Sequence, residues 1–547
     1  MAVITPDSDV ILLKVPLEMD EKNQLTFANA TAQYNYFYGL SGKKTFDKFT
    51  YQRKDGTITV PELVDNLYGY NYVMYRNEGF STKWFYAYIT DMKFLSPNST
   101  SITIKTDVWQ TWQFDITRKA CFVEREHVND DTIGANTVPE GMDVGEYVIN
   151  GTPTQLQPDK SVVDEQNHAI TAEAMICFQV TETVGTISVG NQINRAFSGL
   201  YFMAVGSVTA ARNLVKVYSN LGKADAIVSI FMAPTSFFAG AHVVTDTFTS
   251  PAVTITIYSP VDNAYATTLK DTTTLTTYST LDGYTPRNNK LLTYPYNYLY
   301  VTNNVGADAV YHYEDFLSNT PKFYIGGALG QGCSIKLAPV NYKRHGSAQY
   351  PTENYTYALT GAKYPICAWN SDYYTNWLAQ NAGNIQAKIL SSTGSGLVMG
   401  TMFSGGNVAM GVGMGFLNLA QSAISAYAED AKAKIMPDEA HGNANCSDVN
   451  FAWRRYFTAQ NMCVRAEYAR IIDDFFSEFG YKVNRVKIPN ITGRTNWNYV
   501  KTIGCYIRAD IPQDDVIEIQ SMFDKGVTFW HNASTFGDYT QSNTIVS

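Results

Sequence analysis

The chain has 547 residues, of which 45% are hydrophobic and 17% are charged, and its formal net charge is −9. This length and apolar content allow several packed domains and exclude a disordered chain. The acidic balance argues against a protein that reads nucleic-acid sequence, because such a protein carries a clustered basic surface. The 38 tyrosines, together with many Thr, Val and Ile, favour strands, so we expect a mainly β protein of α+β type.

The cysteines and the N-terminus indicate where the protein assembles. Seven cysteines are widely spread and form no C-x-x-C pair, which favours free buried thiols in a protein assembled in the cytosol. The first residues lack a basic region and already carry Asp7 and Asp9, so we expect no signal peptide.

Residues 11–149 show short apolar–polar alternations separated by turns. Residues 84–94 and 100–116 both alternate with period two, and Pro97 and Asn98 between them supply a turn. We therefore expect a hairpin there, with a short connecting helix at 60–67.

The middle of the chain predicts a small α+β insertion among strands. Residues 168–183 have the pattern of a buried strand, and 208–221 have helical spacing that stops at Gly222. Residues 226–234, 248–280 and 289–303 predict further strands.

Beyond Asp372 the pattern changes. Residues 371–388 predict a helix, and 460–480 predict a strongly amphipathic helix that ends at Gly480. Its apolar residues recur at spacings of three and four: Val464, Tyr468, Ile471, Ile472, Phe475, Phe476 and Phe479. We expect strands in the tail, 481–546.

Residues 389–428 form a 40-residue span without one Asp, Glu, Lys, Arg or His. Glycine costs roughly 1 kcal/mol per helical position relative to alanine, so the span is unsuited to an ordinary core helix. Gly405 and Gly406 break it near the middle. As helices, the halves 389–404 and 408–428 would be about 24 and 32 Å long, close to the ~30 Å hydrocarbon core of a bilayer.

Each half of the span also carries two glycines four residues apart, a spacing that lets helices approach closely in lipid. We interpret the span as a helical hairpin that enters a membrane conditionally. The residues predicted to contact lipid are Leu397, Val398, Met399, Met402, Phe403, Val408, Met410, Val412, Met414, Phe416, Leu417 and Leu419. The glycines predicted to form the turn and the helix–helix contacts are Gly396, Gly400, Gly405, Gly406, Gly411 and Gly415.

Two other interpretations of the span stay open. It is either a glycine-rich loop, packed in a soluble core or disordered, or a permanent transmembrane anchor. The flanks lack an aromatic belt, which disfavours the permanent anchor.

Motifs for catalysis are missing from the sequence. It contains no phosphate-binding glycine loop, no zinc-binding histidine spacing and no G-x-S-x-G motif. We therefore predict no catalytic residue, no metal and no cofactor. Residues 124–127 (EREH) are predicted to be a strand whose alternate charges face solvent or a neighbouring subunit, and Trp109 and Trp112 to be core or interface aromatics.

Several motifs at the two ends occur together in one family. They are QYNYF (33–37), WFYAYITDMKF (84–94), DVWQTWQFDI (107–116) and FVEREHV (122–128), then FGYKVNRVKIPN (479–490), NYVKT (498–502) and FDKGVTFWH (523–531). In order and spacing they resemble the tail-knob, or distal tail-tube, proteins of short-tailed bacteriophages of the phi-29 type.

The resemblance implies a multi-domain β-barrel or β-sandwich tube subunit, with a few helices and a long apolar loop, in a ring-shaped homo-oligomer, a hexamer in the family. It implies a virion protein at the tail tip whose hydrophobic loops plug the lumen and then form a pore in the host membrane during genome ejection. The implied partners are further copies of the chain, the lower collar or tail-tube protein, the host cytoplasmic membrane, and phage DNA passing without sequence-specific binding.

We accordingly expect four regions. Residues 1–150 form an N-terminal β-rich tube domain, and 151–385 a β-rich middle with the α+β insertion. Residues 386–445 form the membrane-active loop, and 446–547 a helix and strands that complete the tube. The alternatives are a static tail-tip component, structural or receptor-binding, and a tail enzyme that degrades cell wall.

Overall fold

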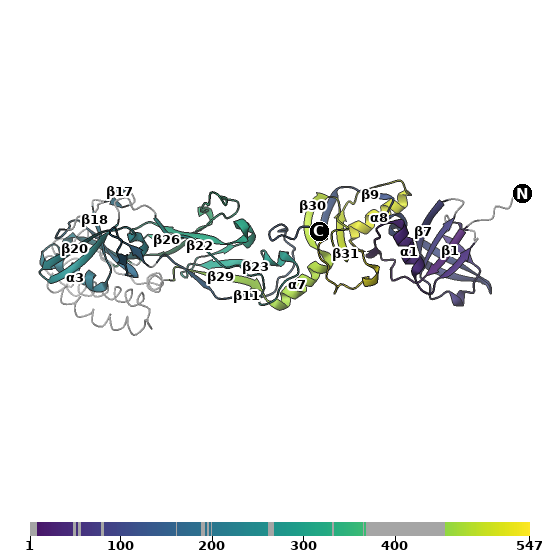
Figure 1. Ribbon diagram of the computed structural model, residues 1–547, viewed down its shortest axis with the longest axis horizontal. Helices are drawn as coiled ribbons and strands as arrows, with labels where there is room; N and C mark the ends of the chain where they lie inside the picture. Colours follow the sequence, from purple (N-terminus) through teal and green to yellow (C-terminus); the bar gives the residue numbers. More distant parts are fainter. Residues whose placement is uncertain are drawn as a thin grey trace, which may run out of the picture. The chain divides into compact units, whose positions relative to one another are not determined.

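The chain divides into two compact units. A computed structural model describes residues 8–47, 51–52, 56–77, 81–159, 161–186, 192–193, 196–197, 200–260, 267–330, 333–364, 366–367 and 455–546. Unit 1 comprises Met1–Gly145, Gly283–Leu292 and Ala466–Ser547, and unit 2 comprises Glu146–Asp282 and Thr293–Arg465. The chain therefore passes between the units four times. In Figure 1, unit 1 accordingly combines purple strands from the start of the chain with yellow elements from its end.

Unit 1 contains two main sheets. The first has seven antiparallel strands in the order β3 (Lys44–Asp47), β1 (Ser8–Leu13), β6 (Tyr72–Asn77), β7 (Ser81–Ser96), β8 (Ser99–Thr106), β5 (Thr57–Val60) and β4 (Tyr51–Gln52). The second has the order β2 (Asn23–Leu25), β33 (Val527–Trp530), β31 (Trp497–Ile503), β10 (Cys121–Glu126) and β30 (Tyr481–Lys487). A small pair joins β9 (Ile116–Arg118) to β32 (Ile507–Ala509).

Strands β1 and β6 of the seven-stranded sheet are buried on both faces. Along β1, Val10 and Leu12 enter one apolar core, and Ile11 and Leu13 enter another, as the two-residue period of a strand requires. The four helices of unit 1 in the described residues are α1 (Ala30–Gly39), α2 (Val108–Trp112), α7 (Ala466–Phe479) and α8 (Gln513–Lys525).

The second sheet carries helices on both faces. Its residues Val500 and Phe529 share a core with Ile519 and Phe523 of α8. On the other face, the Phe479 ring of α7 lies 5.1 Å from the Tyr499 ring of β31. The sheet is therefore the middle layer of this part of unit 1.

Unit 2 contains three larger sheets. One has the order β11 (Tyr147–Ile149), β29 (Phe457–Val464), β23 (Asn297–Thr302) and β24 (Asp308–Tyr311), with β12 (Thr154–Leu156) also paired to β29. The second has the order β20 (His242–Thr249), β21 (Ala252–Ser259), β18 (Tyr201–Val205), β15 (Ala174–Val180), β19 (Ile227–Pro234) and β28 (Ile366–Cys367). The third has the order β22 (Thr267–Thr274), β25 (Lys322–Gly327), β26 (Ser334–Pro339) and β27 (Leu359–Lys363).

Two small hairpins and one helix complete the regular elements described in unit 2, apart from 3-10 turns. The hairpins are β13 (Val162–Val163) with β14 (Ala169–Ile170), and β16 (Gln192–Ile193) with β17 (Ala196–Phe197). Helix α3 (Val208–Asn220) is capped by the Ser207 hydroxyl and is followed by Gly222 at φ +67°. The helix predicted at 208–221 is therefore confirmed.

Most predicted elements are found, with three corrections. The hairpin around Pro97 and Asn98 is confirmed, but residues 108–112 turn into helix α2 because the Asp107 carboxylate caps them. The predicted helix 460–480 starts too early, since 457–464 pair as the central strand β29. The tail is not all strand: Gln513–Lys525 is helix α8, whose apolar side enters the core with period 3.6.

The prediction of a mainly β chain is confirmed. Trp109 and Trp112 are buried, as expected. The buried free thiols expected from the sequence are present at Cys121, Cys177, Cys463 and Cys505. The ring-shaped oligomer stays a prediction.

The end of α7 gives a test of this packing. Gly480 has φ +65°, and a Cβ there would lie 2.3 Å from the carbonyl oxygen of Glu126. Gly480→Ala should therefore lower the free energy of unfolding of unit 1 by about 3 kcal/mol, measured by urea denaturation. Gly504 has a similar φ of +68° but open space around it, so Gly504→Ala should cost only about 1 kcal/mol. Equal losses would contradict the close approach at Gly480.

Candidate functional site

A ten-residue segment of unit 1 runs between two long stretches of unit 2. This segment, Gly283–Leu292, is called the strap below. It is joined to unit 2 at both of its ends, through Asp282 and Thr293, yet it packs within unit 1. Three carboxylates of unit 1 hold it: those of Asp473 and Glu140 are buried, and that of Asp131 is partly buried.

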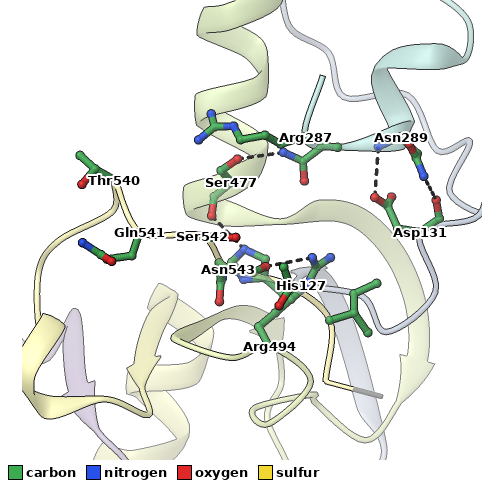
Figure 2. Close-up of a pocket in the computed structure, with 13 residues that line it drawn as sticks. His127, Asp131, Arg287, Asn289, Ser477, Arg494, Thr540, Gln541, Ser542 and Asn543 are labelled. Atoms are coloured by element: carbon green, nitrogen blue, oxygen red, sulfur yellow. Dashed lines mark hydrogen bonds between the residues drawn. The ribbon is translucent and has the colours of Figure 1, made fainter. Parts of the chain in front are cut away.

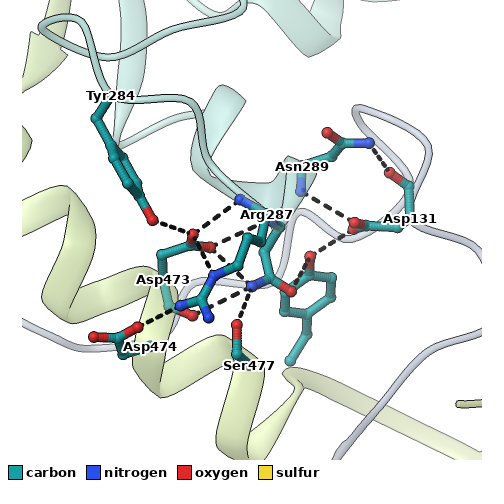
Figure 3. A network of polar contacts seen from close by, with 9 residues as sticks. Asp131, Tyr284, Arg287, Asn289, Asp473, Asp474 and Ser477 are labelled. Carbon is teal, nitrogen blue, oxygen red and sulfur yellow. Dashed lines mark hydrogen bonds and ion pairs between the residues drawn. The ribbon is translucent and has the colours of Figure 1, made fainter. Parts of the chain in front are cut away.

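Asp473, on helix α7, is the centre of the first contact (Figure 3). Its Oδ2 accepts hydrogen bonds from Tyr284 Oη at 2.6 Å and from Arg287 N at 2.9 Å. Its Oδ1 accepts from Asn288 N at 3.1 Å and from Asn288 Nδ2 at 2.8 Å. The carboxylate is fully buried, and the Arg287 guanidinium, with Nε at 3.3 Å, balances its charge. Buried and saturated with donors, Asp473 fixes the path of the strap.

Asp131 and Glu140 hold the other end of the strap. Asp131 accepts from Asn289 N at 3.1 Å and from Tyr481 Oη at 2.5 Å. Glu140 pairs with Lys290 and with Arg125, and it also accepts from the main-chain N–H of Lys482 at 3.0 Å. Burial is the main cause that raises the pKa of Asp131, and it lowers the pKa of Lys290. These charges are therefore tolerated because each has a partner.

The local sequence explains why Asp473 points inwards. On α7 the buried residues Ala469, Ile472, Asp473 and Phe476 follow the helical period, so Asp473 lies within the apolar stripe. An acid in such a stripe is a sequence signal for a buried polar contact, and we did not use it in the sequence analysis. Nothing in the sequence around residues 283–292 indicates that this segment returns to unit 1.

A polar cavity of about 450 Å³ lies beside the clamped strap (Figure 2). Its walls come from the strap, from Ser477 of α7, from Arg494 and from residues 540–545. Arg494 is nine-tenths buried and donates to the carbonyl oxygens of Asn543 and Val128. The partly buried Asp131 and the more exposed Arg287 line the same cavity, so its wall carries charges of both signs.

His127 is buried in the wall of this cavity. Its Nδ1 accepts from Tyr499 N at 2.7 Å, and its Nε2 lies 3.1 Å from the carbonyl oxygen of Ser477. This pair of contacts requires the neutral tautomer with the proton on Nε2. Burial, with the positive charge of Arg494, lowers the pKa of His127 to about 3. The ring is therefore a structural hydrogen-bonding group rather than a proton carrier at neutral pH.

The prediction for residues 124–127 is half right. Residues 121–126 form strand β10, but Glu126 and His127 face the interior rather than solvent. Glu126 binds Lys487 and accepts from Asn490 N at 2.9 Å. The charged residues of β10 therefore include one that makes an internal polar contact with β30. Alternation in the sequence alone does not distinguish such a buried charge from one on an exposed strand face.

The three carboxylates that hold the strap are unsuited to acid–base catalysis, because protein donors already occupy them. Within the described ranges, no group of three or more His, Cys, Asp or Glu residues is placed to hold a metal ion. The arrangement is a mechanical clamp on the strap.

All predicted membrane-contact residues and glycines lie in 396–419, which is outside the described residues. The predicted helix at 371–388 also lies outside them. No helix in the described part of the chain combines the length and the apolar character needed to cross a bilayer.

The comparisons with known proteins agree with one another. The family described as "Bacillus phage phi29, Tail knob protein gp9, C-terminal domain" matches residues 262–544, and "Caudoviral major tail protein N-terminus" matches residues 7–118. The tail knob protein gp9 of Bacillus phage PZA is 27% identical and that of Bacillus phage phi29 is 26% identical, each over 98% of both chains. The solved structure of the bacteriophage C1 tail knob protein, gp12, has 13% identity and a TM-score of 0.63, and the match covers 98% of this chain and 100% of that one.

These matches define a structural protein of a bacteriophage tail. The chain belongs to the tail knob protein gp9 family of phi29-like phages. It is therefore a virion component, as the motifs at its two ends indicated.

Loss of the Asp473 charge should lower the stability of unit 1 strongly, whereas loss of the neighbouring Asp474 charge should lower it little. Asp473→Asn removes the charge that faces Arg287 and turns an amide NH₂ towards strap donors, so it should lower the unfolding free energy of unit 1 by about 3 kcal/mol. Asp474 is mostly exposed and pairs with the same arginine, so Asp474→Asn should cost less than about 1 kcal/mol. Chemical denaturation of both variants measures the difference, and matching losses would show that the strap does not depend on Asp473.

The burial of the neutral His127 ring should make the free energy of unfolding of unit 1 depend on pH in the acid range. An unfolded histidine has a pKa of about 6.5, whereas the pKa of folded His127 is about 3. The stability from the neutral ring is therefore complete above pH 6.5 and falls as the pH drops from 6.5 towards 3. In His127→Asn this slope should disappear, so the gap between wild type and variant should narrow by up to about 3 kcal/mol between pH 7 and pH 4. Denaturation at a series of pH values tests this, and parallel profiles would refute it.

Proposed function

We propose that this chain is the distal subunit of a phage tail that assembles as a ring-shaped homo-oligomer around the path of the DNA. In this proposal, the span 389–428 first closes the lumen and then enters the host cytoplasmic membrane as a pore for genome ejection. The observation that carries it is the combination, in one chain, of full-length similarity to tail knob proteins and a 40-residue span without charge.

The place of the span in the chain supports a tethered, mobile role. In the chain it lies between β28, which pairs with β19, and β29, which pairs with β23, and all four strands belong to unit 2. Strand β29 is central in its sheet, with β11 and β12 on one side and β23 on the other, and two residues later the chain begins helix α7. The described elements on the two sides of the span, β28 ending at Cys367 and β29 beginning at Phe457, both belong to folded sheets, which suits a segment that changes environment while its carrier stays folded.

The physical basis of the switch is a change of surroundings. Apolar side chains avoid water equally well inside a protein ring and inside lipid, so release from the ring shifts the preferred site of the span to the membrane. Glycines four residues apart would let helices from neighbouring subunits associate there. The acidic balance of the chain would let polyanionic DNA pass with few phosphate contacts.

The remaining partners follow from the family resemblance. They are the neighbouring subunits, six in all as in the family, the lower collar or tail-tube protein of the same virion, the host membrane, and the DNA in transit.

Two other functions remain as rivals. In the first, the span is a static stopper of a structural or receptor-binding tail tip. In the second, the protein degrades cell wall, and incubation with purified cell wall would reveal that activity. The clamp carboxylates do not favour the second function, because protein donors fill them.

The pore proposal is tested by replacing only the four regularly spaced glycines of the span. Replacing Gly396, Gly400, Gly411 and Gly415 together by leucine should leave particle assembly unchanged and reduce DNA delivery at least about tenfold, because bulky residues keep the helices apart. The matched control replaces the same four glycines by alanine, which keeps the surfaces small and should retain most delivery. A synthetic peptide of residues 389–428 should release dye from vesicles, and its leucine variant should not. Intact vesicles with the native peptide, or normal infectivity of the leucine variant, would contradict the pore.

A further inference from the structure

The second sheet of unit 1 is only half covered on one of its faces. Helix α7 covers the part near Tyr499, where Phe479 packs, and Arg125, whose guanidinium lies 4.7 Å from the Phe475 ring centre. Trp497 Nε1 also donates to the carbonyl oxygen of Ser477 on α7 at 3.0 Å. The opposite face of the sheet is covered by α8.

Beyond the part that α7 covers, the same face carries a row of exposed apolar side chains. Phe122 on β10 pairs directly with Val486 on β30 and with Ile503 on β31. Val486 is 72% exposed, Ile503 59% and Phe122 37%. We call this row the bare half-face. Three adjacent large apolar residues in register, left in water, mark an interaction surface better than scattered single ones do.

The bare half-face lies at a sheet edge and has a basic border. Within the described strands, β30 ends its sheet, so its outer backbone groups have no strand partner. The next paired row on this face is Lys482, Arg125 and Lys501. Arg125 pairs with Glu140, and Lys501 with Glu124 at 2.9 Å. In the described part of the chain, the side chain of Lys482 has no carboxylate partner.

A second exposed surface of unit 1 has the complementary character. On α8, Ile517 is 54% exposed and the nearby Asp514 is also exposed. Helix α8 packs on the other face of the sheet, where Thr502 Oγ1 donates to Asp524 Oδ1 at 2.6 Å. Successive residues of a strand face opposite sides, so Thr502 points to α8 while Ile503 points to the bare half-face. The two surfaces therefore lie on opposite sides of one sheet.

We propose that the bare half-face binds the Asp514–Ile517 surface of helix α8 in a second copy of this chain. Val486, Ile503 and Phe122 would cover Ile517, while Lys482 would meet Asp514. Two bare half-faces placed against each other would instead bring like charges together. Because the two surfaces differ and lie on opposite sides, the contact is heterologous and repeats from copy to copy until it closes into a ring. This inference rests on the proposed function, whose ring it supplies with an interface.

The apolar row is tested with the full-length chain by native mass spectrometry and sedimentation. The double substitution Val486→Asp and Ile503→Asp should raise the dissociation constant between copies by at least about 100-fold. Both positions are exposed, so the melting temperature of the isolated chain should not change. Val546→Asp, at another exposed apolar position of unit 1, is the matched control and should assemble like the wild type.

The pairing between the two surfaces is tested by a charge swap. Lys482→Glu and Asp514→Arg should each weaken association about tenfold, and the double variant should recover most of it. Assembly of the Val486→Asp, Ile503→Asp variant at the wild-type level would overturn the proposal. So would a wild-type chain that stays monomeric, or single charge variants that the swap does not rescue. Dye release by the isolated 389–428 peptide does not depend on this contact, so leakage with normal assembly of the variants would refute the interface alone.

Discussion

The contacts of three carboxylates, two of them buried, with one short strap are the constraint on which unit 1 depends. A carboxylate removed from water costs several kcal/mol unless donors replace the water, and here the donors come from residues 284–290. Asp131 and Asp473 are far apart in the sequence, and the strap is distant from both. Unit 1 therefore reaches its final packing only after the chain has left it and returned twice. Such long-range closure makes slow folding the expected behaviour.

The same constraint bears on the proposed function, because Asp473 lies on the first helix described after the charge-free span. Of the described elements, strand β29 and the first half of α7 lie between the charge-free span and Asp473, and both are held by contacts within their own units. A segment that exchanges a protein environment for lipid does so without unfolding its carrier only if the elements beside it remain packed. Asp473 is buried at the middle of α7, and its contacts with the strap hold the helix in place. An exposed ion pair at the same position would contribute little to stability.

The sequence predicted the local elements better than the long-range contacts. Alternation found the β7–β8 hairpin, and helical spacing with Gly222 found α3, because both signals are local. Helix α8 was missed because its short apolar stripe is broken by acidic residues, and residues 460–464 were taken for helix because a buried strand and a helix turn look alike over five residues. The clamp was not predictable, since pairing Asp473 with Tyr284 and Arg287 requires knowledge of the return of the chain. The family, in contrast, followed from ordered motifs at both ends.

The most direct test of the central claim is electron cryomicroscopy of the purified full-length protein, alone and with liposomes. The account predicts a ring whose lumen is closed by density without lipid. With liposomes, the lumen should be open and the density from residues 389–428 should lie within the bilayer. A ring with the same closed lumen in both conditions would contradict the account and favour a static stopper.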